Sequence, residues 1–320
     1  MQTRIIRALP LTDMNQESWY NEMETPTRTQ AIFYEAIIDA LDRGYSKMAA
    51  LLLRNHVEGY LERVKKFSVQ SGFLQRDLEI ARDVQKASFP QRAPEIPGLR
   101  CASFYKPAHR VGGDYYDFLP FEDGAWGIAI GDVSGKGISA ALVMATLQAS
   151  LRAQTLLRPR STIETIMSNV NRLVRESSPA EFFASLFYSE YRPESRVLEY
   201  VNAGHHPPLV IRRSHGRCRV LTLRSGSVPV GALEDSHYES QTFQLELADL
   251  LVAYTDGVTE SENSYCIAFG QERLERILCH CSARDPQEIL RHVLDELSAY
   301  SAGGAQADDV TLVVMRVESQ

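Results

Sequence analysis

Four short acidic motifs, far apart in the chain, contain the residues best suited to do chemistry. They are VGGDYYD (Val111–Asp117), IGDVSGKG (Ile130–Gly137), AYTDGVTE (Ala253–Glu260) and ADDVTL (Ala307–Leu312). Each places an aspartate at the boundary of an apolar, strand-like run, in most cases beside glycine. Aspartate and glycine are both unfavourable inside strands, so these boundaries need a specific reason. Carboxylates gathered from distant segments are typical ligands of a hard cation such as Mg²⁺ or Mn²⁺.

The positions of these aspartates predict that they meet. Asp132 and Asp256 follow apolar runs, whereas Asp308 and Asp309 open the last one. In antiparallel neighbours the end of one strand lies beside the start of the next, so we expect one shared sheet edge. Without cations such a cluster would repel itself. Two Mg²⁺ or Mn²⁺ ions about 3.5–4 Å apart would activate a water for attack at phosphorus. The alternative is that each aspartate only shapes a turn, but the joint pattern favours metal.

Composition narrows the class of protein. Hydrophobic residues make up 44% of the chain and charged residues 23%, as in a soluble globular protein. The formal net charge of −7 argues against a general nucleic-acid binder, and no apolar run is long enough to span a membrane. The five cysteines are odd in number and lack CxxC spacing, which predicts no disulfide framework and a cytoplasmic location. The Cys279-His280-Cys281 triplet is not expected to bind a metal.

The pattern of apolar residues changes near residue 98. Residues 1–70 contain two helical patterns, which we interpret as a regulatory or dimerisation region that must pack on something else. Residues 71–97 read as a linker helix and a Pro-rich connector. The apolar stripe of this helix fits a dimer seam or a docking face equally well. Residues 98–320 read as short strands with paired helices, which predicts an α+β domain of antiparallel sheets with helices outside.

The motifs resemble those of the metal-dependent PPM-type Ser/Thr protein phosphatases, in the bacterial SpoIIE/RsbU branch. The resemblance covers about the last three-quarters of the chain. Besides the acidic motifs it includes Glu79–Arg82 with Phe89-Pro90, Asn202–His205 and Pro229–Gly231. It implies a β-sandwich of two antiparallel sheets flanked by helices, and two Mn²⁺ or Mg²⁺ ions.

The resemblance also assigns roles to the acidic residues. Asp132 resembles the ligand that bridges both metals, with the Val133 carbonyl beside it, and Asp114 resembles the ligand of one metal. Asp256 and Asp308 resemble ligands of the other metal, while Asp309 supports them. Which member of the Asp308–Asp309 pair is the primary ligand stays open at this point.

The substrate contacts are less defined. Lys136 fits either a contact to the substrate phosphate or a cap on the glycine turn, and Arg110 is the nearest candidate for a phosphate-holding arginine. The pair His205-His206 precedes two prolines, which favours a turn-shaping role over zinc binding or acid catalysis.

The family implies a function and a mode of regulation. Members of this branch dephosphorylate phosphoserine or phosphothreonine on STAS-domain anti-anti-sigma proteins. In RsbU-type members a helical N-terminal region forms a homodimer and receives an activator protein. We therefore expect partner binding to move the linker helix and complete the metal site.

Two other functions compete with this interpretation. A non-catalytic module could sequester a STAS partner, although the presence of every expected acid favours an enzyme. The second alternative is a hydrolase of small phosphate compounds, but the sequence has no glycine-rich loop that would bind a nucleotide.

Overall fold

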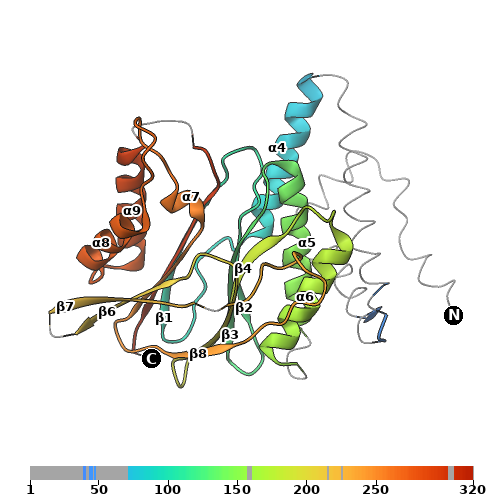
Figure 1. Ribbon diagram of the computed structural model, residues 1–320. Helices are drawn as coiled ribbons and strands as arrows, with labels where there is room; N and C mark the ends of the chain where they lie inside the picture. The colour runs from blue at the N-terminus through green and yellow to red at the C-terminus, as the bar shows by residue number, and fades with distance from the viewer. Residues whose placement is uncertain are drawn as a thin grey trace.

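The protein is a sandwich of two five-stranded antiparallel sheets (Figure 1). The computed structural model describes residues 39–40, 43–45, 47, 71–156, 161–214, 216–224, 226–301 and 306–319. The first sheet has the order β1 (Leu99–Lys106), β10 (Val310–Val317), β9 (Leu250–Tyr254), β6 (Leu209–Ser214), β7 (Arg217–Thr222). The second has the order β2 (Tyr115–Pro120), β3 (Trp126–Val133), β4 (Ala184–Arg192), β5 (Val197–Ala203), β8 (Gln241–Gln244). The predicted fold class is confirmed.

Helices cover the outer face of each sheet (Figure 1). Helices α5 (Ile138–Thr155) and α6 (Ile163–Ser177) pack on the second sheet. Helices α8 (Gln271–Cys281) and α9 (Pro286–Tyr300) pack on the first. The sequence fixes where α9 begins, because the Asp285 side chain accepts a hydrogen bond from the Gln287 amide and Pro286 occupies the first turn. A four-residue helix, α7 (Asp256–Thr259), follows β9 directly.

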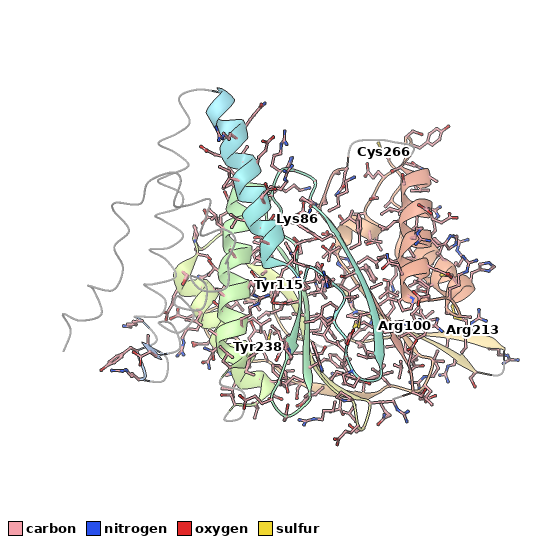
Figure 2. All side chains as sticks on the ribbon, turned by 180° about the vertical axis from the view of Figure 1, so that it is seen from behind. Lys86, Arg100, Tyr115, Arg213, Tyr238 and Cys266 are labelled. Carbon is pink, nitrogen blue, oxygen red and sulfur yellow. A yellow bond between two sulfur atoms is a disulfide. The ribbon has the colours of Figure 1, made fainter. Side chains whose placement is uncertain are left out.

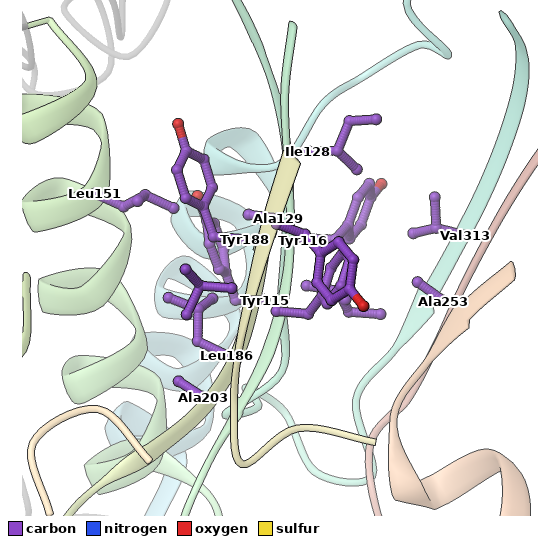
Figure 3. Packing of buried hydrophobic residues seen from close by; sticks show 14 of the residues in the cluster. Tyr115, Tyr116, Ile128, Ala129, Leu151, Leu186, Tyr188, Ala203, Ala253 and Val313 are labelled. Atoms are coloured by element: carbon purple, nitrogen blue, oxygen red, sulfur yellow. The ribbon is translucent and has the colours of Figure 1, made fainter. Parts of the chain in front are cut away.

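Apolar side chains fill the space between the sheets and under the helices. In Figure 3, Tyr116 and Ile128 of the second sheet lie towards Ala253 and Val313 of the first, whereas Leu151 of α5 lies on the other face. A second buried cluster fills the layer between the first sheet and helices α8 and α9. Burial on both sides of each sheet explains why β9 and β10 read as continuous apolar runs rather than alternating ones.

Helix α4 (Ser71–Ser88) is the predicted linker helix, and it contacts the sandwich through its C-terminal end. The Phe89 ring stacks on Tyr105 at 4.4 Å and on Tyr116 at 5.3 Å, centroid to centroid. Along the expected apolar stripe, however, Val84 stays 44% exposed. The stripe is therefore not fully buried against the sandwich. The two helical patterns predicted before residue 71 lie almost wholly outside the described residues.

Several boundaries differ from the predictions. Strand β3 continues to Val133, so Asp132 lies inside the strand rather than after it, because Asp132 and Val133 still pair with Ser185 and Ala184 of β4. The segment from Tyr238 to Leu245 contains only the short strand β8. No helix in the part of the chain that the structure describes is long and apolar enough to cross a membrane.

The sequence predicts no disulfide framework, and the structure contains one disulfide among the described residues. Cys218 and Cys279 form a disulfide across 61 residues of sequence, with their Cα atoms 5.8 Å apart. Strand β7 and helix α8 bring them together, and the spacing of cysteines in the sequence does not reveal a contact made by tertiary packing. Cys101, Cys266 and Cys281 are free.

Candidate metal and catalytic centre

The four acidic motifs meet at one end of the sandwich, and each sheet contributes two. Asp114 precedes β2 and Asp132 lies near the end of β3, both in the second sheet. Asp256 follows β9, and the Asp308–Asp309 pair precedes β10 in the first sheet. The acids lie close enough together for their charges to raise one another's pKa. The expectation of a single sheet edge is wrong, because the two sheets face each other across the cluster.

Asp114 is buried and held by two threonines from the opposite sheet. Its Oδ2 atom accepts hydrogen bonds from the hydroxyls of Thr255, at 2.7 Å, and Thr311. The Thr311 amide donates in turn to the Thr255 hydroxyl at 3.0 Å. These threonines belong to the TDG and DDVT motifs. The two motifs therefore supply acids of their own and also hold Asp114, the acid of the VGGDYYD motif. Sequence reasoning did not assign a role to either threonine.

Asp309 holds the backbone of the loop that carries Asp114. Its Oδ1 atom accepts from the Ala108 amide, and its Oδ2 atom accepts from the Gly113 amide, both at 2.7 Å. A Cβ at Gly112 would lie 2.0 Å from Asp309 Oδ2, so only glycine permits this approach. Both carboxylate oxygens of Asp309 are thus engaged by backbone amides. This geometry favours a supporting role for Asp309.

Asp308 is the more accessible member of the pair. Its Oδ2 atom forms a salt bridge of 2.7 Å with Lys136 Nζ, which also donates to the Ala307 carbonyl at 2.7 Å. Asp308 also raises the pKa of Asp132 and of Asp256 through its charge. It therefore faces the cluster, as expected of a ligand. The ammonium group of Lys136 lies on an acid of the cluster, where it supplies positive charge.

Mutual repulsion marks the cluster as deficient in positive charge. Burial, followed by the charges of Asp256, Asp308 and Asp309, raises the pKa of Asp132 to about 7. Burial and the charge of Asp132 raise the pKa of Asp114 well above its ordinary value. The pKa of Asp256 is raised by burial and by Asp308. Carboxylates in such surroundings are stabilised by a cation.

The donor set fits a hard divalent ion. Every candidate ligand is a carboxylate or carbonyl oxygen, the type that Mg²⁺ and Mn²⁺ prefer. The Val133 carbonyl belongs to the same set, because it lies 3.0 Å from the position of a Cβ on Gly113, next to Asp114. Within the described ranges, however, no three His, Cys, Asp or Glu side chains already stand close enough to hold an ion.

The remaining predicted residues lie elsewhere. The Arg110 guanidinium is exposed and 3.6 Å from Glu79 of α4, so its ion pair is with the linker helix. His205 is buried, with Nδ1 2.8 Å from the Ser185 hydroxyl, and its amide donates to Asn202 Oδ1. These bonds agree with the turn-shaping interpretation of His205. His206 lies near Asp256, whose pKa its charge lowers.

A buried glutamine that the sequence did not single out joins α4 to the catalytic loop. Gln85 Nε2 donates to the Gly112 carbonyl at 2.7 Å, and the Gly112 amide donates to Gln85 Oε1 at 3.1 Å. The Tyr105 hydroxyl donates to the same Oε1 atom. Gly112 lies two residues before Asp114, so α4 directly fixes the backbone that carries a candidate ligand. The signal that could have revealed Gln85 is a polar residue on the inner face of an otherwise exposed helix.

Comparison with known proteins identifies the family. Residues 122–318 match the family model of Stage II sporulation protein E (SpoIIE). The chain belongs to the SpoIIE family. "Phosphoserine phosphatase RsbU" of Bacillus subtilis is 28% identical over 247 residues, which cover 76% of this chain and 70% of that protein. This places the chain in a family of protein phosphatases, as predicted.

Three solved structures share the fold. The SiaA-PP2C domain of Pseudomonas aeruginosa has a TM-score of 0.67 at 20% identity, covering 76% of this chain and 96% of that one. The RsbU and RsbW domains of Rv1364c from Mycobacterium tuberculosis give 0.59 at 26% identity, covering 71% and 62%. RsbX, solved in complex with magnesium, gives 0.52 at 14% identity, covering 71% and 99%.

Proposed function

We propose that the chain is a metal-dependent phosphoprotein phosphatase acting on phosphoserine or phosphothreonine. The observation that carries the proposal is the convergence of all four acidic motifs at one end of the sandwich, where Asp114 is held from the opposite sheet. The similarity to a protein named phosphoserine phosphatase supports the same reaction class. The substrate we propose is a phosphorylated STAS-domain protein of the anti-anti-sigma type.

Each acid has a proposed part in this site. Asp132 would be a ligand of both Mn²⁺ or Mg²⁺ ions, with the Val133 carbonyl beside it, Asp114 would hold one ion, and Asp256 and Asp308 would hold the other. When bound, the ions would activate a water for attack at phosphorus and neutralise charge on the phosphate. Asp309 would hold the 108–114 backbone, and Thr255 and Thr311 would orient Asp114 and favour its ionised form, because their hydrogen bonds lower its pKa.

Regulation is proposed to act through α4. We divide the chain into a helical regulatory and dimerisation region (1–70), the linker helix with its connector (71–97) and the phosphatase domain (98–320). An activator protein bound to the first region would shift α4, and the Gln85–Gly112 hydrogen bonds would transmit that shift to Asp114. The partly exposed stripe of α4 supports a homodimer through this helix. A cytoplasmic location remains a prediction from the sequence.

The test is phosphate release from a phosphoserine STAS protein by the full chain. We expect turnover with Mn²⁺ or Mg²⁺, no turnover with chelator, and a loss of at least about a hundredfold in Asp256→Asn. Asp235→Asn, which changes an exposed aspartate in a loop, is the matched control and should retain activity. Tight binding of the phosphoprotein without turnover, even with candidate activators added, would instead support the non-catalytic scaffold.

A further inference from the structure

A cationic groove runs between the two helices that cover the first sheet. It has a volume of about 340 Å³ and is lined by Arg273, Arg276, Ile277, His280, His292 and Glu296. The first four residues form one stripe of α8, and the last two lie one turn apart on α9. We call this the α8–α9 groove. Its lining has two arginines, two histidines and one acid, in a chain whose net charge is −7 with histidine neutral.

The positive charge of the groove is not neutralised by ion pairs within the described part of the protein. In the portion of the chain described by the structure, none of its four basic side chains forms a salt bridge. Arg276 is exposed, and its Nε donates only to the Glu272 carbonyl of its own helix, at 3.4 Å. Arg273 is fixed at one end, with its guanidinium carbon 3.9 Å from the centre of the Tyr300 ring. An arginine stacked on an aromatic ring keeps N–H groups available for a carboxylate.

The groove begins near the catalytic end of the molecule. The Gly270 amide donates to the Thr259 carbonyl of α7, and Phe269 pairs with Ser261, so the start of α8 is tied to the segment that follows Asp256. Figure 2 labels Cys266 at this end of the helical layer and Arg213 at the other end. Beside Cys266, Tyr265 is 82% exposed and Ile267 57% exposed, while the Tyr300 hydroxyl holds the Ile267 carbonyl.

At its other end the groove meets a second source of positive charge. Residues 200–233 contain five arginines and no acidic residue. Two of these arginines, Arg217 and Arg219, are exposed on β7. Arg213 joins this hairpin to α8, because its Nη2 donates to the Cys279 carbonyl at 2.6 Å and its Nε donates to the Ser282 hydroxyl. These bonds place the arginine-bearing hairpin beside the C-terminal end of α8.

The shape of the groove favours a peptide chain over a small anion. Its stripe on α8 runs over eight residues, from Arg273 to His280, a length of about 10 Å at the rise of an α-helix. That length accommodates about three residues of extended peptide. The groove is open, and Ile277 supplies an apolar contact between the charges. A single phosphate would instead be held by donors that converge on one point.

We propose that the α8–α9 groove docks an acidic segment of the phosphoprotein substrate and thereby positions its phosphoserine at the catalytic end. The inference rests on the proposed function only for the identity of the occupant. Docking remote from the reacting group raises the local concentration of substrate and adds specificity without changing the chemical step.

The test uses the full chain and two readouts. In Arg276→Glu/His280→Glu, we expect the KM for a phosphoserine STAS protein to rise about tenfold, with unchanged kcat and an unchanged rate on p-nitrophenyl phosphate. The anisotropy of a labelled peptide of alternating Glu and Ala should show the same weakening. Arg291→Glu, an exposed arginine of α9 that does not line the groove, is the matched control and should leave both readouts unchanged.

The outcomes separate the alternatives. Equal peptide binding by the wild type and the groove variant, or equal losses in the groove and control variants, would overturn the docking site. Displacement of the peptide by millimolar inorganic phosphate, at constant ionic strength, would also overturn it in favour of a small-anion site. Failure of the wild type to hydrolyse p-nitrophenyl phosphate in Mn²⁺ would count against the proposed phosphatase, whereas the peptide readout would still decide the groove.

Discussion

Asp114 is a buried carboxylate whose charge is favoured by some neighbours and disfavoured by others. The Thr255 and Thr311 hydroxyls lower its pKa, whereas burial and the charge of Asp132 raise it, and the raising effects prevail. Metal binding requires the ionised form. The two hydroxyls therefore make it less costly to keep Asp114 ready for a cation, and they also orient it.

Replacing Thr311 by valine tests this role. Thr311→Val keeps the shape of the side chain but removes the hydroxyl bond, so we expect the apparent affinity for Mn²⁺ to fall about tenfold to a hundredfold. Calorimetric titration of Mn²⁺ measures this directly, and phosphatase activity should need correspondingly more metal. Thr242→Val, on the exposed strand β8, is the control. Unchanged Mn²⁺ affinity in Thr311→Val would refute the role of the hydroxyl.

A variant of Lys136 distinguishes two roles for its ammonium group, one at the metal site and one at the substrate phosphate. Its ammonium group lies on Asp308, so it competes with a cation for that carboxylate. We expect Lys136→Gln to lower the Mn²⁺ concentration needed for half-maximal activity by several-fold, with little change in KM for the phosphoprotein. A steady-state titration of metal at saturating substrate measures this. If KM rises instead and the metal requirement stays constant, Lys136 contacts the substrate phosphate.

The sequence predicted the acids of the site more readily than their partners. Asp132 and Asp256 stand out because aspartate is unfavourable at the end of an apolar run. Thr255 and Thr311 do not stand out, since threonine is an ordinary strand residue. Their role depends on β9 and β10 pairing beside each other and facing Asp114, which is tertiary information.

At the level of elements, helix α4 is the most informative. Gln85 is only 9% exposed on a helix whose other described residues are mostly accessible, and it pairs with both backbone groups of Gly112. An amide side chain can replace a missing strand neighbour in this way, because it offers one donor and one acceptor. Any rotation of α4 would break both bonds, so the geometry of the catalytic loop depends on the helix.

Gln85→Ala should uncouple the helix from the loop. We expect a fall in kcat of about tenfold or more, because the loss leaves two buried backbone groups of Gly112 without partners, each costing about 1–3 kcal/mol. Phosphate release gives kcat, and urea unfolding shows whether the fold is retained. Gln91→Ala, which removes bonds to the Lys86 and Phe89 carbonyls at the end of α4, is the control. Normal turnover by folded Gln85→Ala would exclude this route of regulation.

Element prediction succeeded where the pattern was local. The start of α9 follows from Asp285 and Pro286, and the limits of β10 coincide with the apolar run Val310–Val317 that follows the last acidic pair. It failed at α7, because a helix of four residues is too short for any periodicity. The prediction also ended β3 too early, because the glycine and aspartate near its end are typical turn residues. In the structure these residues still pair with β4.

At the scale of the whole molecule, the two sheets must stay in register for the site to exist. The acids come from both sheets, and so do the groups around His205. This histidine contacts Ser185 of β4 in the second sheet, and it lies close enough to the Tyr254 backbone of β9 in the first for that backbone to affect its pKa. Burial and the charge of His206 lower its pKa to about 3. His205 is therefore neutral in the folded protein at any pH at which the protein is expected to act.

This burial makes the stability of the protein depend on pH. The pKa of His205 lies near 6.5 in the unfolded chain and near 3 in the folded one, so its contribution is complete above pH 6.5. As pH falls below 6.5, only the unfolded chain gains the proton, and the folded state is disfavoured by about 2 kcal/mol at pH 5. The loss would continue until pH approaches 3.

Comparing variants isolates this contribution from that of the carboxylates. His205→Asn keeps a polar atom near the position of Nδ1 but cannot titrate, so its unfolding free energy should fall less than that of the wild type between pH 7.5 and pH 5. Over this pH range the wild type should lose about 2 kcal/mol more unfolding free energy than His205→Asn. The comparison is made in metal-free buffer, where the acidic cluster contributes equally to both proteins. His237→Gln, at an exposed position, should follow the wild type. Urea unfolding at each pH gives the values, and parallel curves for the wild type and His205→Asn would show that His205 is accessible to protons in the folded state.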